Sequence, residues 1–158
     1  MGNIFSASEI LNIAIRIEKN GKDFYSAVAA QSKNANAREI FLYLAGEEEK
    51  HLTVFQKISS GLEKYEPAES FPGEYSSYMN ALAGENIFTQ LDKGKEIAKT
   101  AKNDLEAIAI GIKAEKDSIA FYKGMQKAVS AYDQNAVEEV IAQEELHLRQ
   151  LTQLQKSI

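Results

Sequence analysis

Cysteine is absent from the sequence, and proline and glycine are scarce, with two and nine residues among 158. The lack of cysteine excludes disulfide bonds, thiolate zinc sites, cysteine-ligated iron–sulfur clusters and a cysteine nucleophile. The scarcity of helix breakers, together with long runs of Ala, Glu, Lys, Ile and Leu, favours helix throughout. No segment shows the alternating polar and apolar pattern of a strand. We therefore expect an all-α protein.

A basic cluster and a long apolar run are also lacking. The formal net charge is −5, which argues against nucleic acid as a partner. No apolar run approaches the roughly 18 residues of a membrane-spanning helix, and the N-terminus lacks the basic-then-apolar pattern of a signal peptide. We therefore expect a soluble, cytoplasmic protein. The length and the 44% hydrophobic content fit one domain over residues 1–158 with a sizeable core.

Helical periodicity and turn signals predict a first helical hairpin over about residues 7–60. Ser6 and the glutamate three positions later have the spacing of a capping box at its start. The polar cluster 32–36 is typical of a turn, and a second helix follows from about residue 37. Gly61 is expected to end that helix.

The rest of the chain is predicted to form a crossover and a second hairpin. Both prolines lie in the crossover and break it into short helices. A crossover of this length can span a helical bundle. The crossover is predicted over about 61–102, with short helices at 74–83 and 93–101. The second hairpin is predicted over about 103–158. Its third helix runs from 103–104 to about 129, a turn follows at 130–133, and a fourth helix continues to the C-terminus.

The two hairpins resemble each other in sequence. Residues 12–25 align with residues 109–122 without a gap, and six of these fourteen positions are identical. The alignment matches Glu18 with Glu115, each on the apolar face of its helix. Duplication of one helical hairpin is the simplest explanation. Shared ancestry alone would not require matched glutamates on apolar faces.

The chain has only two histidines, and each follows a glutamate by three positions. The two Glu-x-x-His tetrapeptides, at 48–51 and 144–147, also correspond in the repeat. Residues three apart on a helix lie on one face, with Cβ atoms about 5–6 Å apart. Each Glu-x-x-His can therefore bind one metal ion.

The spacing along the helices predicts that these residues meet. The midpoint between Glu18 and Glu48 lies inside the first predicted turn, and that between Glu115 and Glu144 lies at the edge of the second. Residues equally far from the turn of an antiparallel hairpin lie level with each other, here about 22 Å from the turn at 1.5 Å per residue. Packing the hairpins together then gathers four glutamates and two histidines: Glu18, Glu48, His51, Glu115, Glu144 and His147.

Charge balance favours metal at the centre of such a cluster. Each buried carboxylate without a cation would cost several kcal/mol or take up a proton. Two divalent ions would balance four carboxylates, and oxygen with imidazole ligands suits iron or manganese, while zinc would compete. The alternative is that each helical glutamate is a solvated charge at the edge of an apolar stripe.

As a set, these residues resemble the metal ligands of the ferritin-like superfamily, and specifically of the rubrerythrin family. The family pattern is a glutamate on helices one and three and Glu-x-x-His on helices two and four. The resemblance covers both hairpins and implies a ferritin-like four-helix bundle that holds two iron ions in a non-haem diiron centre. It also implies that some carboxylates bridge the irons while each histidine binds one.

The chain departs from rubrerythrins proper in two respects. Those proteins carry a C-terminal rubredoxin module with iron on four cysteines, and this chain has no cysteine. An external electron donor such as a rubredoxin is therefore implied. They also have a further glutamate ligand on helix three, whereas the residues three positions from Glu115 are Ile112 and Ser118. These departures bear on the family's peroxidase cycle rather than on the diiron site.

Two tyrosines are candidates for a supporting role. Tyr25 and Tyr122 lie two helical turns from Glu18 and Glu115, on the same faces. In similar proteins such tyrosines donate hydrogen bonds to ligand carboxylates or lie near the oxygen pocket. Packing in the core beside the neighbouring phenylalanines is the alternative.

Three further glutamates lie near the predicted site in sequence. Glu49 and Glu145 follow the ligand glutamates but point about 100° away around the helix. We expect them to be exposed, and orientation of neighbouring groups is the alternative. Glu85 in the crossover is a weaker candidate and is expected to be solvated.

The resemblance implies a diiron oxidoreductase that reduces hydrogen peroxide with electrons from an external donor. Dioxygen is an alternative oxidant. A ferroxidase or iron-handling protein is the second hypothesis, and a helical scaffold without enzymatic activity is the third. Relatives are often dimers, so a homodimer is expected, and the long crossover would permit exchange of hairpins between chains.

Overall fold

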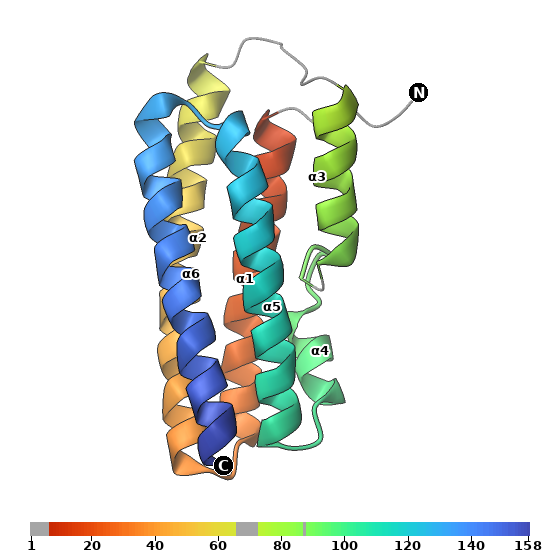
Figure 1. Cartoon of the computed structure of the whole chain (residues 1–158), viewed down its shortest axis with the longest axis vertical. Helices are drawn as coiled ribbons and strands as arrows, with labels where there is room; N and C mark the ends of the chain where they lie inside the picture. The colour runs from red at the N-terminus through yellow and green to blue at the C-terminus, as the bar shows by residue number, and fades with distance from the viewer. Residues whose placement is uncertain (1–6, 66–72, 87) are drawn as a thin grey trace.

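The computed structural model describes residues 7–65, 73–86 and 88–158. Over these ranges the protein contains six α-helices, a short 3₁₀ helix and no strand, so the predicted all-α fold is confirmed. Four long helices form a bundle (Figure 1). They are α1 (Ala7–Gln31), α2 (Ala35–Tyr65), α5 (Asp104–Met125) and α6 (Ala131–Ser157).

The bundle consists of two hairpins joined by a crossover. Helix α1 packs against α2, and α5 packs against α6, while α1–α5 and α2–α6 contacts join the hairpins. Helices α2 and α5 run in the same direction, so the chain has to travel back along the bundle between them (Figure 1). Helices α3 (Gly73–Glu85) and α4 (Gly94–Thr100) lie on this return path, against α5 and α1 respectively.

A buried asparagine of α1 fixes the crossover to the bundle. The Asn20 side chain donates hydrogen bonds to the backbone oxygens of Phe88 and Gln90, at 2.6 and 2.5 Å. Its oxygen accepts from the backbone nitrogens of Lys93 and Gly94, at 3.0 and 3.1 Å. A Cβ at Gly94 would lie 2.3 Å from the backbone oxygen of Asn20, so only glycine allows this close approach. All four hydrogen-bonding groups of one amide side chain are thus used.

The helix starts follow the polar residues that the sequence offers. The Asn34 side chain accepts a hydrogen bond from the backbone of Ala37 at 3.0 Å, which caps α2. Asn103 caps α5 in the same way, accepting from the Glu106 backbone at 2.9 Å. The predicted turn at 32–36 is shorter than expected, because α2 already begins at Ala35.

Several predicted helix ends are wrong. Gly61 does not end α2, which continues to Tyr65, and no described glycine has a positive φ. A glycine in helical conformation costs only about 1 kcal/mol, which the surrounding turns of a long helix offset. At the end of the third long helix, α5 stops at Met125 and a 3₁₀ turn covers Gln126–Ala128, so the helix is shorter than predicted. The capping box at Ser6 lies outside the described residues.

The start of the last helix also differs from the prediction. Helix α6 begins at Ala131, inside the predicted turn at 130–133, with Ser130 as the residue before it. The two predicted short helices of the crossover are present, with slightly shifted ends.

Aromatic rings make up much of the core between the hairpins. The Tyr25 ring stacks on Phe41, with centroids 6.4 Å apart, and the Tyr122 ring packs on Phe55 at 4.9 Å. Both tyrosines are at most 1% exposed. A phenylalanine of α2 therefore holds each tyrosine ring and leaves its hydroxyl free to reach another helix.

Candidate metal centre

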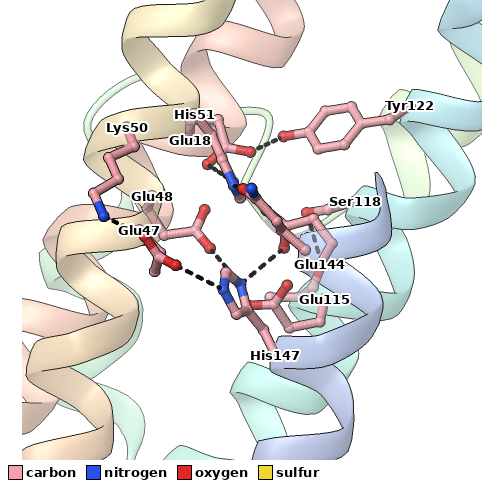
Figure 2. Close-up of polar contacts among 12 residues, drawn as sticks. Glu18, Glu47, Glu48, Lys50, His51, Glu115, Ser118, Tyr122, Glu144 and His147 are labelled. Carbon is pink, nitrogen blue, oxygen red and sulfur yellow. Dashed lines mark hydrogen bonds and ion pairs between the residues drawn. The ribbon is translucent and has the colours of Figure 1, made fainter. Parts of the chain in front are cut away.

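The six residues that the sequence predicts as ligands come together in the bundle (Figure 2), and each lies near the middle of its helix. They come from all four long helices, one glutamate each from α1 and α5 and one Glu-x-x-His each from α2 and α6. None of the six is more than 4% exposed: Glu18, Glu48, His51, Glu115, Glu144 and His147.

Their ligand atoms form two groups. One consists of Glu18, Glu48, His51 and Glu144, and the other consists of Glu48, Glu115, Glu144 and His147. Within each group, one ligand atom from each residue lies within 4.8 Å of the others. Glu48 and Glu144 belong to both groups. The geometry therefore offers two overlapping sets of candidate ligand atoms that share two carboxylates.

Several buried polar atoms of the cluster lack a hydrogen-bond partner. In the described part of the chain these include one oxygen of each glutamate and both ring nitrogens of His147. Buried carboxylate oxygens without a donor carry the full cost of lost hydration. Atoms of this kind, on oxygen and imidazole ligands that face one another, fit bound cations.

His51 holds a proton where a cation would fit. Its Nδ1 lies 2.7 Å from Glu144 Oε1 and 3.7 Å from Glu18 Oε2. Burial lowers the pKa of His51, but the hydrogen bond to Glu144 and the charges of both carboxylates outweigh burial and raise the pKa to about 11. The imidazole is therefore protonated at neutral pH, and a metal ion at Nδ1 has to displace this proton.

The two shared glutamates differ in proton affinity. Burial, followed by the charges of Glu144 and Glu18, raises the pKa of Glu48 well above its ordinary value. Burial also acts to raise the pKa of Glu144, but the facing imidazoles of His147 and His51 outweigh it and lower the pKa. Without metal, Glu48 therefore holds a proton more readily than Glu144 does.

The two tyrosines donate hydrogen bonds across the hairpins. Tyr25 of α1 donates to Glu115 of α5 at 2.8 Å. Tyr122 of α5 donates to Glu18 of α1 at 2.5 Å, as Figure 2 shows. Burial, with the nearby carboxylate charges, raises the pKa of both phenols well above the ordinary value, so both remain donors. The two interpretations left open by the sequence hold together, since each ring packs in the core and each hydroxyl orients a glutamate of the other hairpin.

Sequence reasoning missed two residues that face the histidines. Gln143 Oε1 lies 2.6 Å from His51 Nε2, and Glu47 Oε1 lies 3.8 Å from His147 Nε2. Each immediately precedes the glutamate of a Glu-x-x-His, so the two occupy matched positions in the repeat. That match is a sequence signal for the pair, but it does not show that each residue faces a histidine of the other helix.

Of the two glutamates expected to be exposed, Glu49 is exposed and Glu145 is only partly so. Glu49 pairs with Lys22 at 3.3 Å, and Glu145 lies 3.7 Å from Lys123. The Ser118 hydroxyl donates to the backbone of its own helix, at 2.8 Å. Neither ligand group among the described residues includes a second residue of α5. The side chain of Glu85 lies outside the described residues.

A glycine of α1 leaves room for a shared carboxylate. A Cβ at Gly21 would lie 3.0 Å from Glu48 Oε2. This distance is tighter than ordinary van der Waals contact, so with a larger residue the carboxylate would have to shift by a few tenths of an ångström. Gly21 thus lets Glu48 lie between the two hairpins.

Comparisons with known proteins agree with this geometry. The family model for rubrerythrin matches residues 9–155. The structure is similar to that of a Thermotoga maritima protein assigned to the ferritin-like diiron-carboxylate class, with a TM-score of 0.77 and 28% identity over 99% of this chain and 98% of that chain. A hypothetical protein from Pyrococcus furiosus shares the fold, with a TM-score of 0.68 and 24% identity over 96% and 89% of the two chains. A search of curated proteins found no match.

The bundle and its buried cluster define a ferritin-like protein whose core fits a metal site. Within that class, the chain belongs to the rubrerythrin family. No helix in the described part of the chain is long and apolar enough to span a membrane.

Proposed function

We propose that the six residues hold two iron ions and that the protein reduces hydrogen peroxide with electrons from an external donor. The observation that carries this proposal is the pair of facing ligand groups that share Glu48 and Glu144. Two divalent ions would match the charge of four buried carboxylates, and membership of the rubrerythrin family favours iron.

A bound diiron pair would supply two electrons at once to the O–O bond and act there as Lewis acid. Reduction of one peroxide to two waters consumes two electrons and two protons. We propose that a small one-electron carrier protein, such as a rubredoxin, supplies the electrons in two steps. The chain itself holds the carboxylates in place through Tyr25 and Tyr122 and excludes bulk water from the cluster.

A small cavity beside the cluster favours a small molecule as the oxidant. About 220 Å³ of space lies between α2 and α6, with His51 and Gln143 among the lining residues and Lys50 and Glu139 exposed at the surface. A volume of this size admits peroxide or dioxygen and is below the usual range for larger organic substrates.

The first test is an anaerobic titration of the metal-free protein with Fe(II), followed by one equivalent of peroxide with absorbance recorded. We expect two irons per chain and rapid appearance of the bands of an oxo-bridged diferric pair. The matched variants are Glu48→Gln, which should lose stoichiometric binding, and Glu49→Gln, which alters the exposed neighbouring carboxylate and should retain it. Absence of peroxide turnover above that of free iron, with a reduced donor present, would contradict the proposed activity.

A ferroxidase is the second candidate, favoured by the acidic residues beside the same cavity. Glu47 and Glu139 both line it next to His51, and their charges would attract Fe(II). Rapid oxidation in air but not by peroxide, with uptake well beyond two irons per chain, would support this candidate over peroxide reduction.

A further inference from the structure

The outer nitrogens of the two histidines face different chemical groups. His51 Nε2 lies 2.6 Å from the amide oxygen of Gln143, whereas His147 Nε2 faces the carboxylate of Glu47 at 3.8 Å. In both histidines Nδ1 points to the glutamates, at 2.7 Å from Glu144 for His51 and at 3.9 Å from Glu144 for His147. The residue that faces Nε2 of each histidine thus comes from the other helix of the α2–α6 pair. In that helix it directly precedes the glutamate of the Glu-x-x-His.

The carboxylate of Glu47 is held in place by its own helix. Tyr43 donates to Glu47 Oε1 at 2.9 Å. Lys50 Nζ lies 3.1 Å from Glu47 Oε2, as Figure 2 shows. The Tyr43 ring also meets the His147 ring edge-on, with centroids 6.1 Å apart. The Glu47 side chain is only 14% exposed. It therefore presents a fixed, largely buried charge to His147.

The second hairpin has no equivalent of this arrangement. In the repeat, Glu47 corresponds to Gln143, and Tyr43 and Lys50 correspond to Glu139 and Leu146. At neutral pH the side chains of Glu139, as a carboxylate, and of Leu146 cannot donate a hydrogen bond. The two hairpins match in every proposed ligand but differ in the three residues that decide what lies outside the histidine.

This difference acts on the metal through the imidazole ring. A histidine that binds metal through Nδ1 carries its proton on Nε2 and donates it to an outer acceptor, which sets the basicity of the ring. A carboxylate acceptor makes the ring a stronger ligand than an amide oxygen does, because a charge-assisted hydrogen bond is about twice as strong as a neutral one. The Glu47–His147 distance needs to shorten by only about 1 Å to form that bond.

We propose that Glu47 and Gln143 make the two metal positions unequal, and that the position at His147 binds its ion more tightly than the position at His51. Glu47 is then a positioning residue that acts through His147. The proposal rests on the proposed metal centre, but not on the nature of the oxidant.

The test is a titration with Mn(II), in which free ion is counted by its EPR signal. The unaltered chain should bind two ions with two distinct dissociation constants. Glu47→Gln should weaken the tighter step by about 10- to 100-fold, the usual effect of losing the outer partner of a histidine ligand. Gln143→Glu should strengthen the weaker step. Glu49→Gln removes a nearby exposed charge that faces no histidine, and should change neither step.

Repeating the Glu47→Gln substitution in two histidine variants shows which metal position it affects. In a His51→Ala chain, which retains only the His147 position, Glu47→Gln should weaken the remaining site; in a His147→Ala chain it should have no effect. Tyr43→Phe, in the otherwise intact chain, should weaken the tighter step by a smaller factor, because Glu47 loses its orienting donor. That variant keeps all six ligands, so the test stands even where a histidine variant fails to fold.

The outcomes separate this inference from the proposed metal centre. Failure of the unaltered chain to bind two ions would overturn both. Two ions bound with equal constants, or Glu47→Gln changing both steps equally or neither, would overturn the inequality alone and leave the metal centre standing.

Discussion

At the scale of single residues, the site depends on hydrogen bonds and clearances that hold charged groups in the core. Each tyrosine hydroxyl fixes a glutamate of the opposite hairpin, at 2.8 Å for Tyr25 and 2.5 Å for Tyr122. The other oxygen of each of these glutamates has no protein donor. One oxygen is thus held by the protein and the other is left for a cation.

Replacing Tyr122 by phenylalanine should destabilise the metal-free protein by about 1–3 kcal/mol, because a buried carboxylate oxygen of Glu18 loses its donor. The aromatic packing on Phe55 remains, so the fold should be kept. Urea unfolding followed by circular dichroism measures the change. Tyr132→Phe is the matched control, since that side chain is 91% exposed and its loss should be neutral. Equal stability of both variants would show that the hydrogen bond to Glu18 contributes nothing.

Gly21→Ala should separate stability from metal binding. Alanine favours helix by about 1 kcal/mol over glycine, so the metal-free protein should not lose stability. The added Cβ would displace Glu48, 3.0 Å away, and should weaken metal binding by about tenfold or more. Gly46→Ala, where the Cβ meets nothing within 4 Å, should leave binding unchanged. Isothermal titration calorimetry of both variants with the same metal measures the difference. Identical binding by the two variants would contradict the view that Gly21 makes room for Glu48.

The site residues that could be predicted from the sequence are those whose position is unusual within their own helix. Buried glutamates on apolar faces and the repeated Glu-x-x-His were visible in this way. Glu47 and Gln143 were not, because each acts on a histidine of a different helix, and only the approach of α2 to α6 places them there. The direction of the tyrosine hydroxyls, across the hairpins, likewise depends on that packing.

At the scale of helices, the crossover is fixed to the bundle close to the site. Asn20, two residues after Glu18, makes four hydrogen bonds to the backbone of residues 88–94. Most helices were predictable from periodicity and from Asn and Ser before their first turns. The end of α2 was not, because Gly61 lacks the left-handed conformation that a glycine stop needs, and the helix continues through it.

Asn20→Ala should reduce the free energy of unfolding by about 2–4 kcal/mol, since two backbone N–H groups and two carbonyls lose their only side-chain partner. The exposed Asn12→Ala on the same helix is the control and should change it by less than about 0.5 kcal/mol. Hydrogen exchange should also become faster in residues 88–100 of the variant. Unchanged exchange there would mean that α4 is held by its apolar contacts with α1 alone.

At the scale of the whole molecule, the bundle is organised around a buried cluster of carboxylates and imidazoles that fits bound cations. Four glutamates and two histidines from all four long helices lie in the core. A bound metal ion therefore contributes to the stability of the whole bundle, because it binds the folded chain and not the unfolded one.

The stability of the metal-free protein should depend on pH in a direction set by His51 and Glu48. Both have a pKa raised by folding, His51 to about 11, so each stabilises the fold at low pH and loses that effect as pH rises. Glu144, whose pKa is lowered, has the opposite effect and weakens the fold only in acid. Metal-free stability should thus fall from about pH 6 to about pH 8.

Metal loading should reverse this trend, since ions displace the proton of His51 more readily as pH rises. At about 100 times the dissociation constant, each ion adds roughly 2.7 kcal/mol. The melting temperature should therefore rise on loading by about 5–20 °C, and more at pH 8 than at pH 6. Equal melting temperatures with and without metal, at both pH values, would favour the scaffold hypothesis instead.

The most direct test of the central claim is a crystal structure of the iron-loaded protein with anomalous scattering measured at the iron edge. We expect two iron peaks, one among Glu18, Glu48, His51 and Glu144 and the other among Glu48, Glu115, Glu144 and His147. A single peak, or iron bound only at the surface, would contradict the dinuclear centre on which the proposed function depends.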